Sequence, residues 1–160
     1  TSTNLAGFIN RKGVFAPDER RSWGDDSAGM LLKWAEGPTG QHIELGISEM
    51  NLFLLLGQLG LSGDLSGQPL LPVGTVYDPF VLRGLDAFIH GVYSGSRFVV
   101  AGTPSGVTLA PEGGAHQSTI TPSVGLELPE VTLVEPAYAV CLDWLLCDVI
   151  CQPARTCHSV

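Results

Sequence analysis

A near-continuous apolar run, 97–101, leads directly into a glycine-rich segment, 102–118, and this junction constrains the fold of the 160-residue chain more than any other feature. A strand that is apolar at successive positions has to be covered on both of its faces. Such coverage is typical of a parallel strand inside an α/β sheet. Because ligands of these sheets bind beyond the carboxyl ends of the strands, we expect 102–118 to border a binding site.

Strand and helix patterns alternate on both sides of this junction. The segments expected as strands are 70–76, 97–101 and 131–134. Asp78 and Pro79 supply an N-cap and a proline at the first helical position, which predicts a helix that ends between 91 and 95. A last helix is expected over 136–150. The alternation implies right-handed crossovers, so we predict an α/β fold with a parallel sheet flanked by helices.

The first long helix is expected over 48–60, after a short strand at 42–45. Ser48 stands at the N-cap position, and Glu49 lies in the first turn, where the helix dipole favours a carboxylate. The body of this helix, 52–56, is apolar on every side and therefore needs cover on every side. A single short domain offers little cover, so we predict a dimer or larger complex held largely by 52–56.

Length and composition indicate one domain. With 44% hydrophobic residues, 160 residues suffice for one substantial core and are too few for two ordinary domains. We assign 1–150 to this domain, with loops and one or two short helices over 1–40, and 151–160 to a tail without regular structure. The N-terminus has no basic or apolar leader pattern, and we expect the chain to be a piece of a longer protein.

The charge balance and the cysteines indicate which partners and which cell compartment to expect. Lys and Arg total 8 against 16 Asp and Glu, a net charge of −8, so no basic patch favours nucleic acid or an anionic membrane as a partner. The cysteines are Cys141, Cys147, Cys151 and Cys157. Their spacing favours free thiols in a cytoplasmic protein over a zinc knuckle or a disulfide framework. Cys147 and Cys151 lie one helical turn apart, which suits a shared metal ion or, more commonly, two small residues on one helix face.

Two polar side chains stand out against this apolar background. The helix dipole alone explains Glu49, but the apolar helix around it places its carboxylate at the rim of a core, where a buried acid needs a partner. His116 lies in the run Glu-Gly-Gly-Ala-His-Gln over 112–117, where packing does not explain a histidine. An imidazole suits proton transfer at neutral pH. Of the other histidines, His42 is a further candidate for the site, whereas His90 and His158 are assigned to a helix and the tail.

Three segments, 41–52, 73–80 and 102–123, resemble the pyrimidine-binding domain of the thiamine diphosphate-dependent transketolase-like superfamily. Gly-Ile-Ser-Glu over 46–49 matches the Gly-(Ile/Val)-x-Glu motif of this superfamily. The run over 112–117 is similar to Glu-Asp-Gly-Pro-Thr-His-Gln of transketolases, with Gly-Ala in place of Pro-Thr. The likeness covers about 1–150 and is closest to the homodimeric bacterial type of pyruvate dehydrogenase first component.

The resemblance implies a role in cofactor binding or catalysis for four residues. The carboxyl group of Glu49 would hydrogen-bond a ring nitrogen of the aminopyrimidine and so promote loss of the proton on the thiazolium carbon. Tyr77 would stack on the pyrimidine ring with Phe80 as its support, although core packing explains two aromatic residues here almost as well. Val76 stands where transketolases have phenylalanine. His116 would transfer a proton to or from a substrate oxygen.

The same resemblance implies a reaction and partners. The reaction is decarboxylation of a 2-oxo acid, foremost pyruvate, with transfer of the acyl unit to a lipoyl carrier. The alternatives are ketol transfer between sugar phosphates, or a catalytically silent assembly or regulatory fragment. Enzymes of the family hold the diphosphate and Mg²⁺ through a Gly-Asp-Gly…Asn motif on a separate domain, and this sequence contains no Gly-Asp-Gly. The implied partner is therefore a diphosphate-binding domain or subunit of the same enzyme, in a homo-oligomer.

Overall fold

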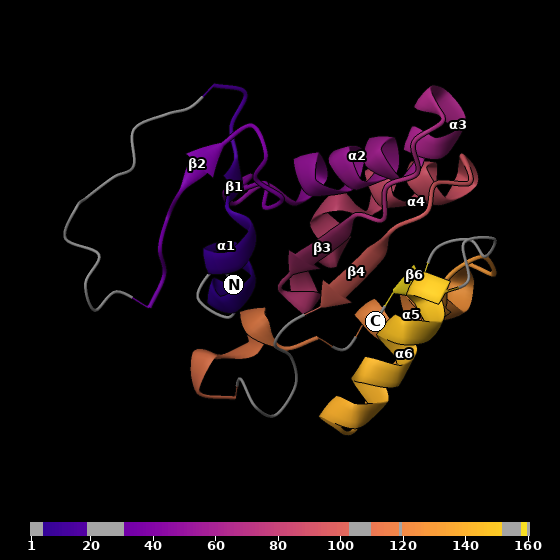
Figure 1. Cartoon of the computed structure of the whole chain (residues 1–160). Coiled ribbons are helices and arrows are strands. Elements are labelled where there is room, and N and C mark those ends of the chain that lie inside the picture. The colour runs from indigo at the N-terminus through magenta and orange to yellow at the C-terminus, as the bar shows by residue number, and fades with distance from the viewer. Residues whose placement is uncertain (1–4, 19–30, 103–109, 119, 152–157, 160) are drawn as a thin grey trace. The chain divides into compact units, whose positions relative to one another are not determined.

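The computed structural model describes residues 5–18, 31–102, 110–118, 120–151 and 158–159, and Figure 1 shows its helices and strands. The contacts divide the chain into two compact units, 1–47 and 48–160. Each unit has buried residues of its own. The single domain expected over 1–150 stays a prediction.

The first unit combines one short helix with a pair of short parallel strands. Helix α1 (Ala6–Lys12) buries Ile9 and is followed by β1 (Val14–Phe15), which pairs with β2 (Glu36–Gly37). The expected short helix in 1–40 is therefore present. The strand expected at 42–45 is wrong: His42 forms a single bridge to Val14 and no strand follows. Polar and apolar residues do alternate over 42–45, but within the described residues only His42 has a pairing partner there, and one bridge does not make a strand.

The second unit contains a four-stranded sheet in which every pairing is parallel. The strands are β3 (Val73–Val76), β4 (Val99–Gly102), β5 (Thr132–Leu133) and β6 (His158–Ser159), in the order β3-β4-β6-β5. Val73 lies opposite Val99, and the register continues to the end of both strands. The predicted mixed α/β structure with parallel pairing is confirmed. The expected strands were longer than those observed at 70–76 and 131–134.

The tail predicted to lack regular structure contributes a strand. β6 lies between β4 and β5 and bonds to both. The prediction for 151–160 was wrong because a strand of two residues is too short to show a hydrophobic period. Such a strand is formed by the hydrogen bonds of its neighbours rather than by its own side chains.

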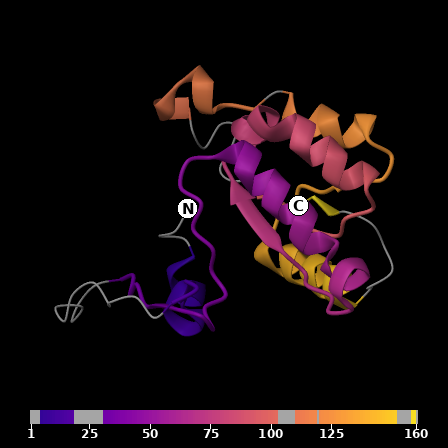
Figure 2. The same cartoon turned by 90° about the horizontal axis from the view of Figure 1, so that it is seen from above.

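Two helices form one layer against the long strands. Figure 2 shows α2 (Glu49–Gly60) and α4 (Leu85–Tyr93) side by side. Their backbones approach closely where Gly57 meets Gly91, since a Cβ added to Gly57 would lie 3.6 Å from the Cα of Gly91. Phe53 of α2 is fully buried and packs edge-on against Phe88 of α4, with ring centroids 5.4 Å apart. The core of this unit therefore lies between the two helices and the sheet.

The observed bounds of α2 agree with the predicted ones, whereas the next predicted helix begins as a 3₁₀ helix. Ser48 is the N-cap residue of α2, as predicted, but its side chain makes no cap hydrogen bond. The helix predicted to start after Asp78 instead begins with that residue as a 3₁₀ helix, η1 (Asp78–Gly84), with Tyr77 at the N-cap. α4 then ends at Tyr93, within the predicted range. Proline among the first residues of η1 favours the helical start but leaves one hydrogen-bond donor fewer.

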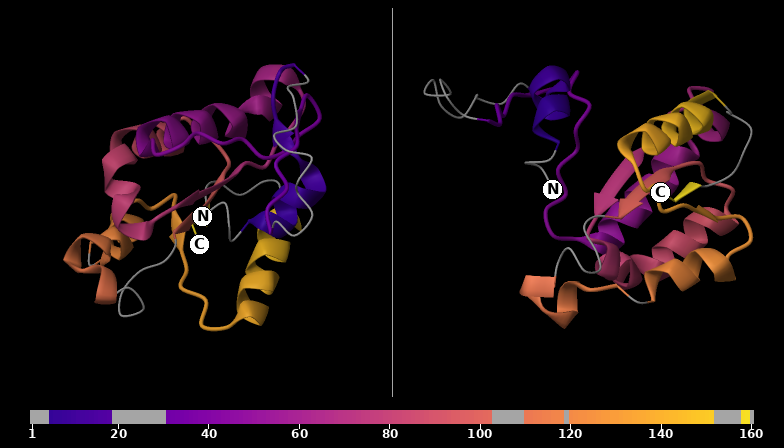
Figure 3. Two further views of the ribbon diagram at one scale, coloured as in Figure 1. Left: turned by 90° about the vertical axis from the view of Figure 1, so that its left-hand side faces the viewer. Right: turned by 90° about the horizontal axis from the view of Figure 1, so that it is seen from below.

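The last helix is the least covered element. α6 (Ala139–Cys151) begins three residues later than the predicted start and has no buried residue. In Figures 1 and 3 it lies on the side of β3 and β4 away from α2. Short helices that were not predicted include α3 (Ser62–Ser66), η3 (Gly114–His116) and α5 (Thr121–Glu127). None of the helices in the described part of the chain has the length and apolar character that crossing a bilayer requires.

Candidate functional site

The 3₁₀ helix η1 and its N-cap residue align three side chains. Tyr77, Phe80 and Arg83 are spaced three residues apart, and residues at this spacing eclipse one another in a 3₁₀ helix. The rings of Tyr77 and Phe80 meet edge-on with centroids 6.0 Å apart. The guanidinium carbon of Arg83 lies 3.8 Å from the centroid of the Phe80 ring, which is a cation–π contact. The local helix type therefore builds an aromatic and cationic stack.

Glu49 joins this stack through Arg83. The Arg83 Nη1 donates to the Glu49 Oε1 at 3.5 Å, the outer limit for a hydrogen bond. The Glu49 side chain is only 14% exposed, whereas that of Arg83 is 56% exposed. Gly84 permits the close approach of the two elements, since a Cβ there would lie 2.8 Å from the backbone oxygen of Glu49. Close packing of η1 on the start of α2 thus brings the carboxylate to Arg83, whose guanidinium lies over Phe80.

His116 completes the group from the far end of the glycine-rich segment. It ends η3, whose N-cap Gly113 has φ +84°, a conformation that favours glycine. The imidazole contacts both aromatic rings edge-on, with centroids 6.0 Å from Tyr77 and 5.5 Å from Phe80. Its Nδ1 is buried and has no hydrogen-bond partner among the described residues. A buried polar atom without a partner is costly, which makes this nitrogen a point where a ligand or water is favoured.

The structure therefore brings together the four residues singled out from the sequence. Tyr77, Phe80 and His116 contact one another, and Arg83 connects Phe80 with Glu49. We call these five residues the Glu49–His116 cluster. Tyr77 and Phe80 are half-buried, and Phe80 also packs against the hydrophobic core of this unit, so packing stays an alternative explanation for it. The remaining part of the expected binding loop, 103–109, lies outside the described residues.

His42 lies in the first unit and has a different set of partners. Its Nε2 is 3.2 Å from Glu44 Oε2, and its ring meets that of Trp34 edge-on at 6.0 Å. The prediction that His42 faces the site remains a prediction. His90 is exposed on α4, as expected, with Asp86 one turn away at 3.9 Å.

Arg83 is the member of the cluster that sequence reasoning missed. The signal was present as the three-residue spacing of Tyr77, Phe80 and Arg83 directly after a strand. An α-helix was expected there, and exposed arginines on α-helices are common. The 3₁₀ conformation places Arg83 over Phe80, and only the packing against α2 places it beside Glu49.

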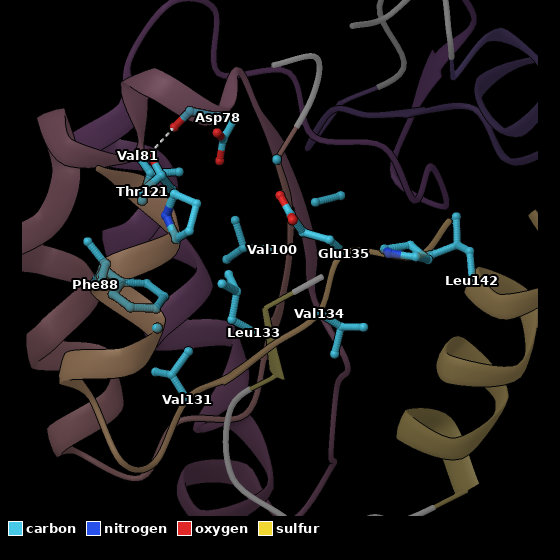
Figure 4. Close-up of a pocket in the computed structure, with 16 residues that line it drawn as sticks. Asp78, Val81, Phe88, Val100, Thr121, Val131, Leu133, Val134, Glu135 and Leu142 are labelled. Atoms are coloured by element: carbon cyan, nitrogen blue, oxygen red, sulfur yellow. Dashed lines mark hydrogen bonds between the residues drawn. The ribbon is translucent and has the colours of Figure 1, made fainter. Parts of the chain in front are cut away.

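A separate cavity of about 380 Å³ opens at the carboxyl end of β4. Its walls come from η1, α4, β4, α5, α6 and the segment around β5, as Figure 4 shows. Most of the lining is apolar, and the carboxylates that line it belong to Asp78 and Glu135. The hydroxyl of Thr121 donates to the backbone oxygen of Asp78 at 3.0 Å, which links the start of α5 to the start of η1. Ligands of parallel sheets bind at this end of the strands, but of the segment 102–118 that was expected to border a binding site only Gly102 lines the cavity.

The cysteines and other metal-binding side chains form no cluster within the described ranges. No three of the His, Cys, Asp and Glu side chains described come together as metal ligands. Cys141, Cys147 and Cys151 are free thiols there, and Cys157 lies outside the described residues. The described thiols of α6 therefore do not belong to a group of three or more metal-binding side chains.

Comparison with known proteins assigns no function to this group of residues. Compared with models of protein families and with curated protein sequences, the chain gives no match. The motifs and the contacts of the Glu49–His116 cluster are therefore the observations that bear on function.

Proposed function

We propose that this chain is the pyrimidine-binding half of a thiamine diphosphate-dependent 2-oxo acid dehydrogenase, with pyruvate as the foremost substrate. The observation that carries the proposal is the Glu49–His116 cluster. Residues chosen from motifs far apart in the sequence meet through ring contacts of 5.5–6.0 Å and a single arginine. If the two short motifs resembled the family only by chance, their side chains would not be expected to lie in contact.

The chemistry of the cluster fits an aminopyrimidine ring. Such a ring needs a carboxyl group at a ring nitrogen, an apolar or aromatic surface on its face and few competing charges. Glu49 offers the carboxyl group, and a carboxylate has acceptor capacity beyond the one bond from Arg83. Arg83 covers one face of Phe80, which leaves Tyr77 as the ring for stacking and Phe80 as its support.

Each residue then has a distinct task. Thiamine diphosphate, when bound, supplies the electron sink that decarboxylation of a 2-oxo acid requires. Glu49 holds a proton between its carboxyl oxygen and the ring nitrogen, at low exposure to water. His116 moves a proton to or from the substrate oxygen, and its buried Nδ1 has no protein partner among the described residues to oppose this. Arg83 keeps the Glu49 carboxylate in place.

The proposal assigns half of a site to this chain. Its sequence has no Gly-Asp-Gly motif for the diphosphate and Mg²⁺, so these ligands would come from a diphosphate-binding domain or subunit of the same enzyme. Transfer of the acyl unit would then require a lipoyl carrier as a further partner.

We expect the purified chain to bind thiamine and thiamine diphosphate equally weakly, with no effect of Mg²⁺, because it would contact only their common pyrimidine ring. Calorimetric titration with both compounds, with and without Mg²⁺, measures this. Glu49→Gln should weaken the binding of both compounds, whereas Glu127→Gln, an exposed residue outside the cluster, should weaken neither. Micromolar binding of the diphosphate alone, dependent on Mg²⁺, would show that the metal site lies in this chain and that the half-site assignment is wrong.

We also expect the chain to associate through the exposed side of α2. Phe53 and Leu56 face the core, but Met50 is 40% and Leu54 52% exposed on the same helix. Exposed apolar side chains in a row are typical of an interface. The protein core already covers the inner side of this helix. A partner chain would therefore have to cover only its outer side.

Light scattering tests this association. The wild-type chain, alone or mixed with a diphosphate-binding subunit, should give a mass above that of a monomer, and Leu54→Glu should lower it. Gln58→Glu is a matched control because Gln58 is exposed on the same helix and already polar. A wild-type chain that stays monomeric in both samples would contradict the proposed partner and favour a catalytically silent fragment.

A further inference from the structure

The cavity at the carboxyl end of β4 is built from residues that the proposed cofactor site does not use. Neither Glu49 nor His116 lines it, and Tyr77 and Phe80 do not line it either. Its volume of about 380 Å³ falls within the range of about 300–1,000 Å³ that is usual for small-molecule sites. A cavity of this size at the end of a parallel strand is a second place where the fold favours a ligand.

Two carboxylates line the cavity, those of the half-buried Asp78 and the exposed Glu135. Figure 4 shows the carboxylates of Asp78 and Glu135 pointing toward one another from η1 and from the segment after β5. Like charges that face each other repel, and a cation between them removes the repulsion. The lining residues described include no lysine, arginine or histidine that would supply this charge from the protein. The cavity therefore favours a positively charged ligand.

The backbone holds one of these carboxylates at the strand end. Thr121 binds the backbone oxygen of Asp78 at 3.0 Å. A Cβ on Gly102 would lie 3.0 Å from the Asp78 Oδ1, so a glycine there allows the carboxylate to lie against the last residue of β4. The hydrogen bond from Thr121 thus fixes the backbone of Asp78, and the lack of a side chain at Gly102 leaves room for its carboxylate.

The rest of the lining determines what kind of cation fits. Val81, Phe88, Val100 and Val131 are buried apolar residues that form the walls. A divalent metal ion takes about six oxygen ligands, and the described residues gather no three metal-binding side chains here or elsewhere. Apolar walls instead favour a ligand with an apolar body, because its burial removes apolar surface from water.

The geometry points to a binding site for a small organic ammonium ion, with its nitrogen between Asp78 and Glu135 and its apolar body against Phe88 and Val100. This site is independent of the proposed cofactor. It would bind primary amines of about the size of a substituted six-membered ring. It would discriminate against neutral and anionic molecules of the same shape, because these leave the two carboxylates unpaired.

Titration of the full 160-residue chain, followed by its amide NMR spectrum, tests this site with phenethylammonium and with 2-phenylethanol as a neutral compound of similar shape. We expect the ammonium ion to bind at least about tenfold more tightly than the alcohol. Glu135→Gln should weaken binding of the ammonium ion several-fold. Glu130→Gln removes an equal charge from an exposed position outside the cavity and should leave the binding unchanged.

A second pair of variants tests the location of the apolar body. Val134→Phe fills part of the cavity and should abolish binding, whereas Val140→Phe, at a half-exposed position on α6 outside the lining, should not. Equal binding of the ammonium ion and the alcohol, or equal loss with Glu135→Gln and Glu130→Gln, would overturn the inference. Binding of the ammonium ion that is unchanged in the Val134→Phe variant would also overturn the inference. General attraction of a cation to a chain of net charge −8 is excluded by the same comparison of the two glutamate variants.

Discussion

Replacing Glu49 by glutamine is expected to slow loss of the proton on the thiazolium carbon by on the order of 100-fold or more, in an enzyme reconstituted with a diphosphate-binding partner. An amide keeps the shape and some hydrogen bonding of the carboxyl group but cannot share a proton with the ring nitrogen. The low exposure of Glu49, 14%, leaves little room for water to take over this task. Exchange of that proton for deuterium, followed by NMR, measures the step directly.

Stability provides the control for this substitution. The ion pair with Arg83 is long, at 3.5 Å, and its arginine is 56% exposed, so its loss should change the melting temperature by only a few degrees. Glu127→Gln should leave both the exchange rate and the melting temperature unchanged. If Glu49→Gln exchanges the proton as fast as the wild type, Glu49 serves the helix dipole and the proposed function loses its central residue.

Replacing Phe53 by alanine should lower the free energy of unfolding of the second unit by about 3–5 kcal/mol. Phe53 is fully buried, and its ring packs edge-on against Phe88 between α2 and α4. Its removal loses buried apolar surface and leaves a cavity where the two glycines already hold the helices close together. Denaturant unfolding followed by circular dichroism measures the change.

The adjacent residue is a matched control. Leu54 is 52% exposed on the same helix, so Leu54→Ala should change the free energy of unfolding by less than about 1 kcal/mol in the monomer. In an assembly held by α2, the same substitution should weaken association instead. Equal destabilisation by both substitutions would show that α2 is packed differently from the arrangement described, with Leu54 also in a core.

Long apolar segments were predictable because they carry their own periodic signal. The helix expected over 48–60 is α2 (Glu49–Gly60), and the run 97–101 contains most of β4 (Val99–Gly102). The parallel pairing of β3 with β4 followed from the helix between them, since parallel strands need such a crossover. The predicted bounds were less accurate for short strands such as β5, which covers two of the four residues expected.

Short elements escaped prediction because neighbours, and not their own residues, stabilise them. β6 is a strand of two residues that exists through its bonds to β4 and β5. η1 is a 3₁₀ helix where an α-helix was expected, and this difference aligns Phe80 with Arg83. A two-residue strand and a single change of helix type produce no hydrophobic period that could be recognised.

The sequence by itself determined the alternation of strands and helices and the choice of Glu49 and His116 as candidates. Only the tertiary structure decided that Arg83 lies between Glu49 and Phe80, and that a cavity with two facing carboxylates opens beside β4. The physical reason is that a period reports how one segment is exposed or buried, whereas a contact between segments depends on how closely their backbones approach. Here that approach depends on Gly84, where any side chain would meet the start of α2.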